Sequence, residues 1–344
     1  MVMYSNNEII TATADELKRH PEWRNRFDGY ADDIIKKMNE KVAFGRLFQT
    51  RNSLHIYSTT TQSGTEFQIR FVGKIVGIVI YDPKCDVQSD KERIFLTVNE
   101  SHLRIAKALG YDGEAFDKEP WNGKIASDYR SFFKRQEKRT SEELNCAFKK
   151  AKLKKGDEAR VESKLLVELK KGDLIRNINP VTLCGAFFQC ATPLTASDHK
   201  KKPEYQKMGG GIDILARIKH GSNQDNRLAV MEVKDSDKDE TQADALNQAI
   251  AYATFLAYLL RDEKCGNKWW NVFGKGKQVR PELYIDAVTI MPEGCDSEEG
   301  DMTKDLFVPG IPNVKIHPSA LYFKQDGGGN IIGFSGKLID EIDK

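Results

Sequence analysis

Two carboxylates and a lysine occur in two neighbouring segments that read as strands. The segment LAVMEVK at 228–234 is apolar but carries Glu232 and Lys234 near its end, and IDILARI at 212–218 carries Asp213 near its start. Side chains alternate between the two faces of a strand, so Glu232 and Lys234 share a face, with Cα atoms roughly 6.6 Å apart. Charged groups of these types at one end of a sheet could hold a cation and act on water.

The residues between the two segments, KHGSNQDNR at 219–227, favour a chain reversal. An antiparallel pair that turns about the middle of this stretch places residue 213 opposite residue 233, beside Glu232 and Lys234. A register error of one or two residues keeps the charged groups close, although it can change the face on which they lie.

Two carboxylates in contact repel each other, and burial makes the repulsion costlier. A divalent cation removes this conflict, and oxygen ligands suit Mg²⁺ or Mn²⁺. Lys234 could then orient or deprotonate an attacking water whose pKa the cation lowers. This chemistry suits hydrolysis of a phosphodiester bond. The alternative interpretation is a group of ion pairs at a solvated sheet rim.

Other matches to the same spacing are weaker. Glu-x-Lys occurs at 16–18, 162–164, 168–170 and 232–234. The first three lie in helical patterns, where residues two apart do not face each other. Asp82 and Lys84 follow the apolar run IVGIVIY and are a further competitor. They lack an aspartate-bearing partner strand, and the proline between them is awkward in a central strand.

The order helix, strand with Asp, strand with Glu-x-Lys, helix resembles the PD-(D/E)XK, or restriction-endonuclease-like, nuclease superfamily. The resemblance covers roughly residues 158–291, and Ile212 stands where the family name has proline. It implies an α/β fold with a mixed sheet flanked by helices. It also implies a nuclease that uses Mg²⁺ or Mn²⁺ and acts on nucleic acid, DNA more than RNA.

Many members of this superfamily carry a glutamate on the first core helix that reaches the metal. Glu162 is the candidate because it lies on the apolar stripe of the helix predicted at 158–171. Glu168 is the second choice, and a residue at the edge of the stripe that reaches solvent is the alternative. The metal ligands implied by the resemblance are Glu162, Asp213, Glu232 and the carbonyl of Val233.

The helix predicted at about 240–261 carries Gln248 and Tyr252, four residues apart and therefore on one face. The pair resembles the Gln-x-x-x-Tyr element of a branch that includes bacterial recombination exonucleases and phage-type exonucleases, where these residues support the active site and contact DNA. A half-buried aromatic is the alternative for Tyr252. The implied catalytic set is Asp213, Glu232, Lys234, Gln248 and Tyr252. The six cysteines lack the spacing of the iron–sulfur cluster that some members hold.

Two basic segments could contact nucleic acid. Their candidate residues are Lys200, Lys201, Lys202, Lys275, Lys277 and Arg280. The second segment follows Trp269 and Trp270, and aromatic rings beside cations can stack bases and bind the backbone. Solvated loops and a core tryptophan pair are the alternatives.

Length and composition suggest three regions. Residues 1–125 mix helix and strand and form a predicted N-terminal α+β domain for recognition, regulation or oligomerisation. Residues 126–155 are a basic helical connector, either a solvated helix or an arm along phosphates. Residues 156–344 form the nuclease-like domain. The net charge of +2 neither requires nor excludes nucleic acid.

We expect a cytoplasmic protein without a membrane partner, because no signal pattern and no run of about 18 apolar residues occurs. A homo-oligomer and both endo- and exonuclease action stay open. The rival function is a non-catalytic nucleic-acid-binding or regulatory scaffold that keeps the nuclease fold.

Overall fold

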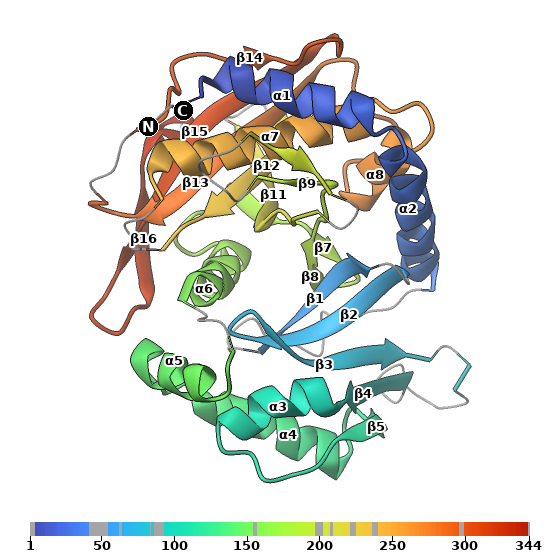
Figure 1. The fold of residues 1–344 in the computed structure, drawn as a ribbon, viewed down its shortest axis with the longest axis vertical. Coiled ribbons are helices and arrows are strands. Elements are labelled where there is room, and N and C mark those ends of the chain that lie inside the picture. Colours follow the sequence, from blue (N-terminus) through green and yellow to red (C-terminus); the bar gives the residue numbers. More distant parts are fainter. Residues whose placement is uncertain are drawn as a thin grey trace. The chain divides into compact units, whose positions relative to one another are not determined.

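The chain forms two compact units in a computed structural model (Figure 1). The structure describes residues 4–40, 54–61, 64–82, 84–85, 93–153, 157–196, 202–206, 209–220, 225–235, 240–295 and 299–342. Unit 1 consists of 1–35, 168–181 and 188–344, and unit 2 consists of 36–167 and 182–187.

Unit 2 is built on a seven-stranded sheet with the order β5-β4-β3-β2-β1-β8-β7. Its strands are β1 (Leu54–Thr61), β2 (Gly64–Phe71), β3 (Lys74–Tyr81), β4 (Ile94–Val98), β5 (Phe116–Pro120), β7 (Thr182–Leu183) and β8 (Ala186–Gln189). Its helices are α3 (Glu100–Ala108), α4 (Lys124–Gln136), α5 (Ser141–Lys150) and the first part of α6 (Asp157–Lys171). Strands β1 to β5 pair antiparallel in sequence order. Short connections join β1 to β2 and β2 to β3, whereas α3 lies between β4 and β5.

The segment 126–155, expected to be a connector, belongs to the core of unit 2. Tyr129, Phe133 and Phe148 are fully buried among the apolar residues of the sheet. The Tyr129 hydroxyl also donates a hydrogen bond to the Val76 carbonyl at 2.7 Å. The high Lys, Arg and Glu content conceals an apolar stripe at helical spacing, which must be buried against a sheet.

Unit 1 contains a mixed sheet with the order β14-β15-β13-β12-β11-β6, and β16 pairs with β15. The strands are β6 (Ile178–Pro180), β11 (Ile214–His220), β12 (Asp225–Val233), β13 (Leu283–Pro292), β14 (Leu306–Phe307), β15 (Val314–Gln325) and β16 (Ile331–Ser335). Strands β12, β13 and β15 are parallel, whereas β11 and β6 continue the sheet antiparallel. A separate pair is formed by β9 (Leu194–Thr195) and β10 (Glu204–Tyr205).

Helices cover both faces of this sheet. They are α1 (Asn6–Arg19), α2 (Trp23–Asn39), α7 (Gln242–Leu260), α8 (Gly266–Val272) and α9 (Lys337–Ile342). Helix α7 connects β12 to the parallel strand β13 and packs on both, and α1 packs against α7 (Figure 1). Because α7 lies between a sheet and a helix, it is buried nearly all round, as its alanine-rich, apolar sequence allows.

The N-terminal helices pack on unit 1 and are not part of a domain that runs to residue 125. Trp23 and Phe27 stack edge-on against Phe255 of α7, and Lys268 of α8 pairs with Asp28 at 2.7 Å. Helix α1 begins after Ser5, which forms a capping box with Glu8. These contacts join segments that lie far apart in the sequence, and the composition of either segment does not predict them.

The expectation of a mixed α/β fold, with mixed sheets flanked by helices, is confirmed. Among the described residues, none of the helices combines the length and the apolar character that crossing a membrane requires.

Candidate active site

The hairpin of β11 and β12 brings the predicted carboxylates together. Ile214 pairs with Met231, so the same register sets Asp213 directly opposite Glu232, one residue from the predicted partner at 233. Residues directly opposite in an antiparallel pair lie on the same face. The backbone N–H of Val233 donates to Asp213 Oδ2 at 3.0 Å, and the Glu232 side chain is hydrogen-bonded to the Asp213 carboxyl.

Glu232 and Lys234 are buried, and Asp213 is half-buried. Glu232 is 5 % exposed and Lys234 is 6 % exposed, so a group of ion pairs at a solvated rim is not what the structure contains. Burial raises the pKa of Asp213, and Lys234, the Val233 N–H and the Glu232 side chain oppose this rise. The opposing groups do not cancel the effect of burial.

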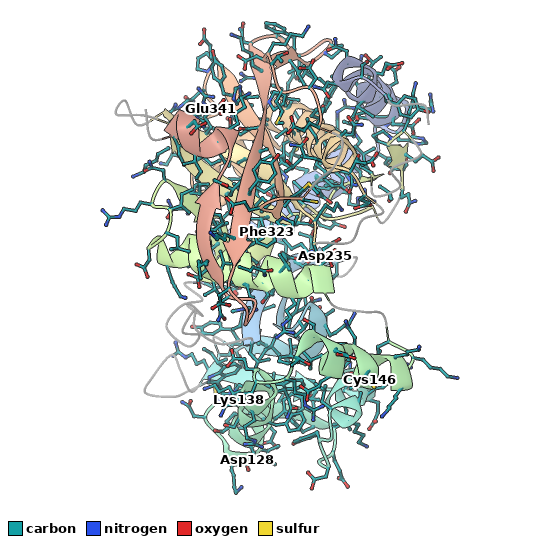
Figure 2. All side chains as sticks on the ribbon, turned by 90° about the vertical axis from the view of Figure 1, so that its left-hand side faces the viewer. Asp128, Lys138, Cys146, Asp235, Phe323 and Glu341 are labelled. Atoms are coloured by element: carbon teal, nitrogen blue, oxygen red, sulfur yellow. The ribbon has the colours of Figure 1, made fainter. Side chains whose placement is uncertain are left out.

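Three acceptors among the described residues contact Lys234. Its Nζ lies 3.2 Å from Glu232 Oε1, 3.4 Å from Gln248 Oε1 and 2.8 Å from Glu240 Oε2. An ammonium has three N–H donors, so three such partners can use all of them. The sequence predicts the first two partners but not Glu240. That residue follows the polar run after Lys234, where an acidic residue reads as part of a solvated turn. Asp235, labelled in Figure 2, directly follows Lys234 at this end of β12.

Helix α7 supplies the amide partner because its N-terminus is fixed close to the end of β12. Thr241 and Asp244 form a capping box. Gln248 is 2 % exposed. Within the described part of the chain, its Nε2 is buried and has no hydrogen-bond partner.

Tyr252, four residues after Gln248, lies close enough to Glu232 for the carboxylate to raise its pKa further, in addition to the larger effect of burial. Its hydroxyl accepts a hydrogen bond from the Ala196 N–H at 3.4 Å. A Cβ at Gly210 would stand 2.8 Å from this hydroxyl, so glycine is required for the chain to pass so closely. Tyr252 therefore anchors the segment before Asp213.

The donors at this site fit a hard divalent cation in chemistry. Within the described residues, no three His, Cys, Asp or Glu side chains converge in a way that could hold a metal ion. Both backbone groups of one strand residue point to the same edge, so the Val233 carbonyl faces β11, as its N–H does. Two carboxylates and a carbonyl are oxygen ligands of the kind that Mg²⁺ accepts while it keeps several waters.

Glu162 lies on the part of α6 that belongs to unit 2. There it is hydrogen-bonded to Tyr57 and lies near Arg70, whose guanidinium is stacked over the Tyr57 ring at 4.6 Å. Burial raises the pKa of Tyr57, and the Glu162 charge adds to that rise. The metal-ligand role of Glu162 remains a prediction from the sequence.

The predicted basic segments are described only in part. Lys200 and Lys201 lie outside the described residues, and Lys202 is exposed with its ammonium over the Tyr4 ring at 5.0 Å. Lys275 donates to the Arg227 carbonyl at 3.3 Å. Lys277 and Arg280 are exposed. Their role in binding nucleic acid remains a prediction.

The tryptophan pair beside the second segment cannot stack bases. Trp269 is 0 % exposed and Trp270 is 3 % exposed. Trp269 packs among Phe27, Phe188 and Phe273, and its Nε1 donates to the Phe27 carbonyl at 3.0 Å. The pair belongs to the core because the N-terminal helices, far away in sequence, cover it.

The competing Asp82 and Lys84 form an exposed turn. The Lys84 N–H donates to Asp82 Oδ1 at 2.9 Å, and both residues are exposed in unit 2. They have the character of a turn and not of a buried site.

A second buried polar group lies on the other face of the unit 1 sheet. Asp286 of β13 is fully buried and pairs with His220 at 3.0 Å and with Arg227 at 3.6 Å. His317 of β15 lies between Asp305 and Glu341, at 2.7 and 3.0 Å. Figure 2 labels Glu341, on α9. Sequence reasoning missed this group, although the aspartate within the apolar run LYIDAVTIM signals it.

Comparison of the chain with family models, with curated proteins and with solved structures finds no match.

Proposed function

We propose that the protein is a nuclease with a restriction-endonuclease-like core that hydrolyses phosphodiester bonds, in DNA more than RNA, with Mg²⁺ or Mn²⁺. The observation that carries the proposal is the contact of Asp213 with Glu232, buried beside Lys234 at the end of a central strand. The order of α6, β11, β12 and α7 supports it, because the resemblance implies this order.

Each residue of the cluster has a chemical task in this proposal. A bound divalent cation would neutralise the paired carboxylates and make an attacking water more acidic. Asp213, Glu232 and the Val233 carbonyl would hold it. The positive charge of the Lys234 ammonium would stabilise the negative charge that develops on the phosphate in the transition state. Gln248 Oε1 holds the ammonium in position.

The direct test is cleavage of supercoiled plasmid and of linear duplex DNA by the full chain, with Mg²⁺, with Mn²⁺ and with a chelator. We expect cleavage that requires a metal and that Glu232→Gln abolishes. Glu282→Gln makes the same chemical change at an exposed position and should cleave at the wild-type rate. Equal cleavage by wild type and Glu232→Gln would place the active site elsewhere.

The rival function is a non-catalytic module that binds nucleic acid. One observation favours it: the described residues contain no convergent set of three metal-binding side chains. This function predicts DNA binding that neither a chelator nor Glu232→Gln alters, with no cleavage of any of the substrates.

A further inference from the structure

The contact between Glu240 and Lys234 is the shortest of the three that hold the lysine, and no sequence motif pointed to it. The distance from Lys234 Nζ to Glu240 Oε2 is 2.8 Å, against 3.2 Å to Glu232 and 3.4 Å to Gln248. Charge-assisted hydrogen bonds are shorter and roughly twice as strong as neutral ones. Glu240 is therefore a main determinant of where the ammonium lies.

The three partners approach the ammonium from different elements. Glu232 comes from β12, Gln248 comes from the second turn of α7, and Glu240 stands just before the N-cap Thr241. The side chains of Lys234 and Glu232 are 7 % and 6 % exposed, whereas that of Glu240 is 23 % exposed. Glu240 is thus the partner on the solvent side of the lysine.

Among the described residues, three acids, Asp213, Glu232 and Glu240, lie around the Lys234 ammonium. Glu232 and Glu240 both contact the ammonium and come from different segments, so its position depends on both carboxylates.

We propose that Glu240 is a positioning residue for the proposed reaction. Its carboxylate holds the Lys234 ammonium from the solvent side and directs it toward the Asp213–Glu232 pair. The inference rests on the proposed nuclease function. Without the Glu240 carboxylate, the ammonium loses its partner on the solvent side and keeps its contacts with Glu232 and Gln248.

The test measures cleavage kinetics of the full chain with Glu240→Ala and Glu240→Gln. An interaction that matters only in the transition state lowers kcat and leaves KM unchanged, so we expect kcat about 10-fold lower for Glu240→Ala with KM within about 2-fold. Glu240→Gln keeps the acceptor and loses the charge, so it should recover part of the rate, to within about 3-fold of wild type.

Asp244→Asn is the matched control. Asp244 lies at the same helix start and accepts from the Thr241 N–H and hydroxyl at 3.1 and 2.8 Å. We expect Asp244→Asn to lower the melting temperature and to leave kcat unchanged. An equal loss of kcat in Asp244→Asn would assign the effect to the helix start and would overturn the proposal.

A second readout does not depend on cleavage. Limited acetylation with an amine-reactive ester, followed by mass spectrometry, reports how well each lysine is held. Lys234 should be modified several-fold faster in Glu240→Ala than in wild type or Asp244→Asn. Unchanged labelling of Lys234, or a kcat that stays equal or rises in Glu240→Ala, contradicts the positioning role. If wild type itself does not cleave while labelling changes as expected, the proposed function fails and the contact stands.

Discussion

The two faces of the unit 1 sheet each bury a charged cluster, and the clusters differ in how their charges meet. On the α9 face, Asp286 meets His220 and Arg227, and His317 meets Asp305 and Glu341. Every acid there contacts a base. On the α7 face, a carboxylate contacts another carboxylate, and one lysine serves the whole group.

This difference distinguishes charged groups that stabilise the fold from charged groups that serve a function. A buried acid that meets a base has its charge compensated within the fold, and removing either partner leaves an uncompensated charge. Two buried carboxylates in contact are instead costly in the folded state. A fold that keeps such a pair needs a reason outside its own stability, and a bound cation with its chemistry is such a reason. Substitutions on the α7 face should therefore change activity, and substitutions on the α9 face should change stability.

Lys234→Ala should lower the cleavage rate about 10²–10⁴-fold, because general acid–base or charge-stabilising groups contribute this much. DNA affinity should change little, since phosphate contacts elsewhere supply most of it. Single-turnover cleavage and a filter-binding assay on the same preparation separate the two effects. A variant that cleaves at the wild-type rate would contradict the assigned role of this lysine.

Asp286→Ala should cost stability on the α9 face. Breaking a buried pair by removing one partner costs about 3–5 kcal/mol, and here His220 loses its hydrogen-bond partner and Arg227 loses a nearby opposite charge. Asp213→Asn on the other face relieves repulsion in metal-free buffer and should leave the free energy of unfolding equal or higher. Urea denaturation of both variants in chelator measures the contrast. Equal destabilisation by the two substitutions would remove the distinction between the faces.

In unit 2, burial alone shifts the pKa of a titratable side chain, His55. Burial lowers the pKa of His55 to about 4 from its ordinary 6.5. The unfolded chain binds a proton between these pH values and the folded chain does not. The stability contributed by neutral His55 is therefore complete above about pH 6.5 and is lost as the pH falls toward 4.

His55→Phe removes this dependence. Between pH 7.5 and pH 5, wild type should lose about 2 kcal/mol more stability than the variant, from the linkage of one such proton. Chemical denaturation at the two pH values measures the difference between the proteins. If both lose the same amount, His55 is not kept neutral by the fold.

The basic surface should give the smallest effect. Lys202→Ala with Lys277→Ala should reduce the slope of log affinity against log salt by about 1 for each lysine that binds a phosphate, evenly across DNA sequences. Lys124→Ala with Lys138→Ala removes the same charge from unit 2 and serves as the control. An unchanged slope in the first double variant would exclude these lysines from the nucleic-acid footprint.

The hairpin and the helix after it could be predicted because their signals are local. Alternation, a polar turn and an apolar strand end place Asp213, Glu232 and Lys234 together, and the i, i+4 rule places Gln248 and Tyr252 on one face of α7. The register differed by one residue because the exact centre of a polar turn sequence does not follow from composition.

The features that could not be predicted from the sequence depend on contacts between segments that lie far apart in the chain. The packing of Trp23 and Phe27 on Phe255 moves the N-terminal helices to unit 1 and buries Trp269. The Glu240 contact depends on the angle at which the chain enters α7, which no periodicity reports. The partners of the buried Asp286 on the α9 face likewise could not be predicted without the strand order of the sheet.

Calorimetric titration of the full chain with Mn²⁺ and with Mg²⁺ is the most direct test of the contrast between the two faces. We expect wild type to bind one divalent ion per chain, Lys234→Ala to bind it as well, and Glu232→Ala to lose most of the binding, because two carboxylates create the site and the lysine only acts beside it. Binding by Glu232→Ala with wild-type affinity, or no binding by wild type, would refute a metal site at Asp213 and Glu232.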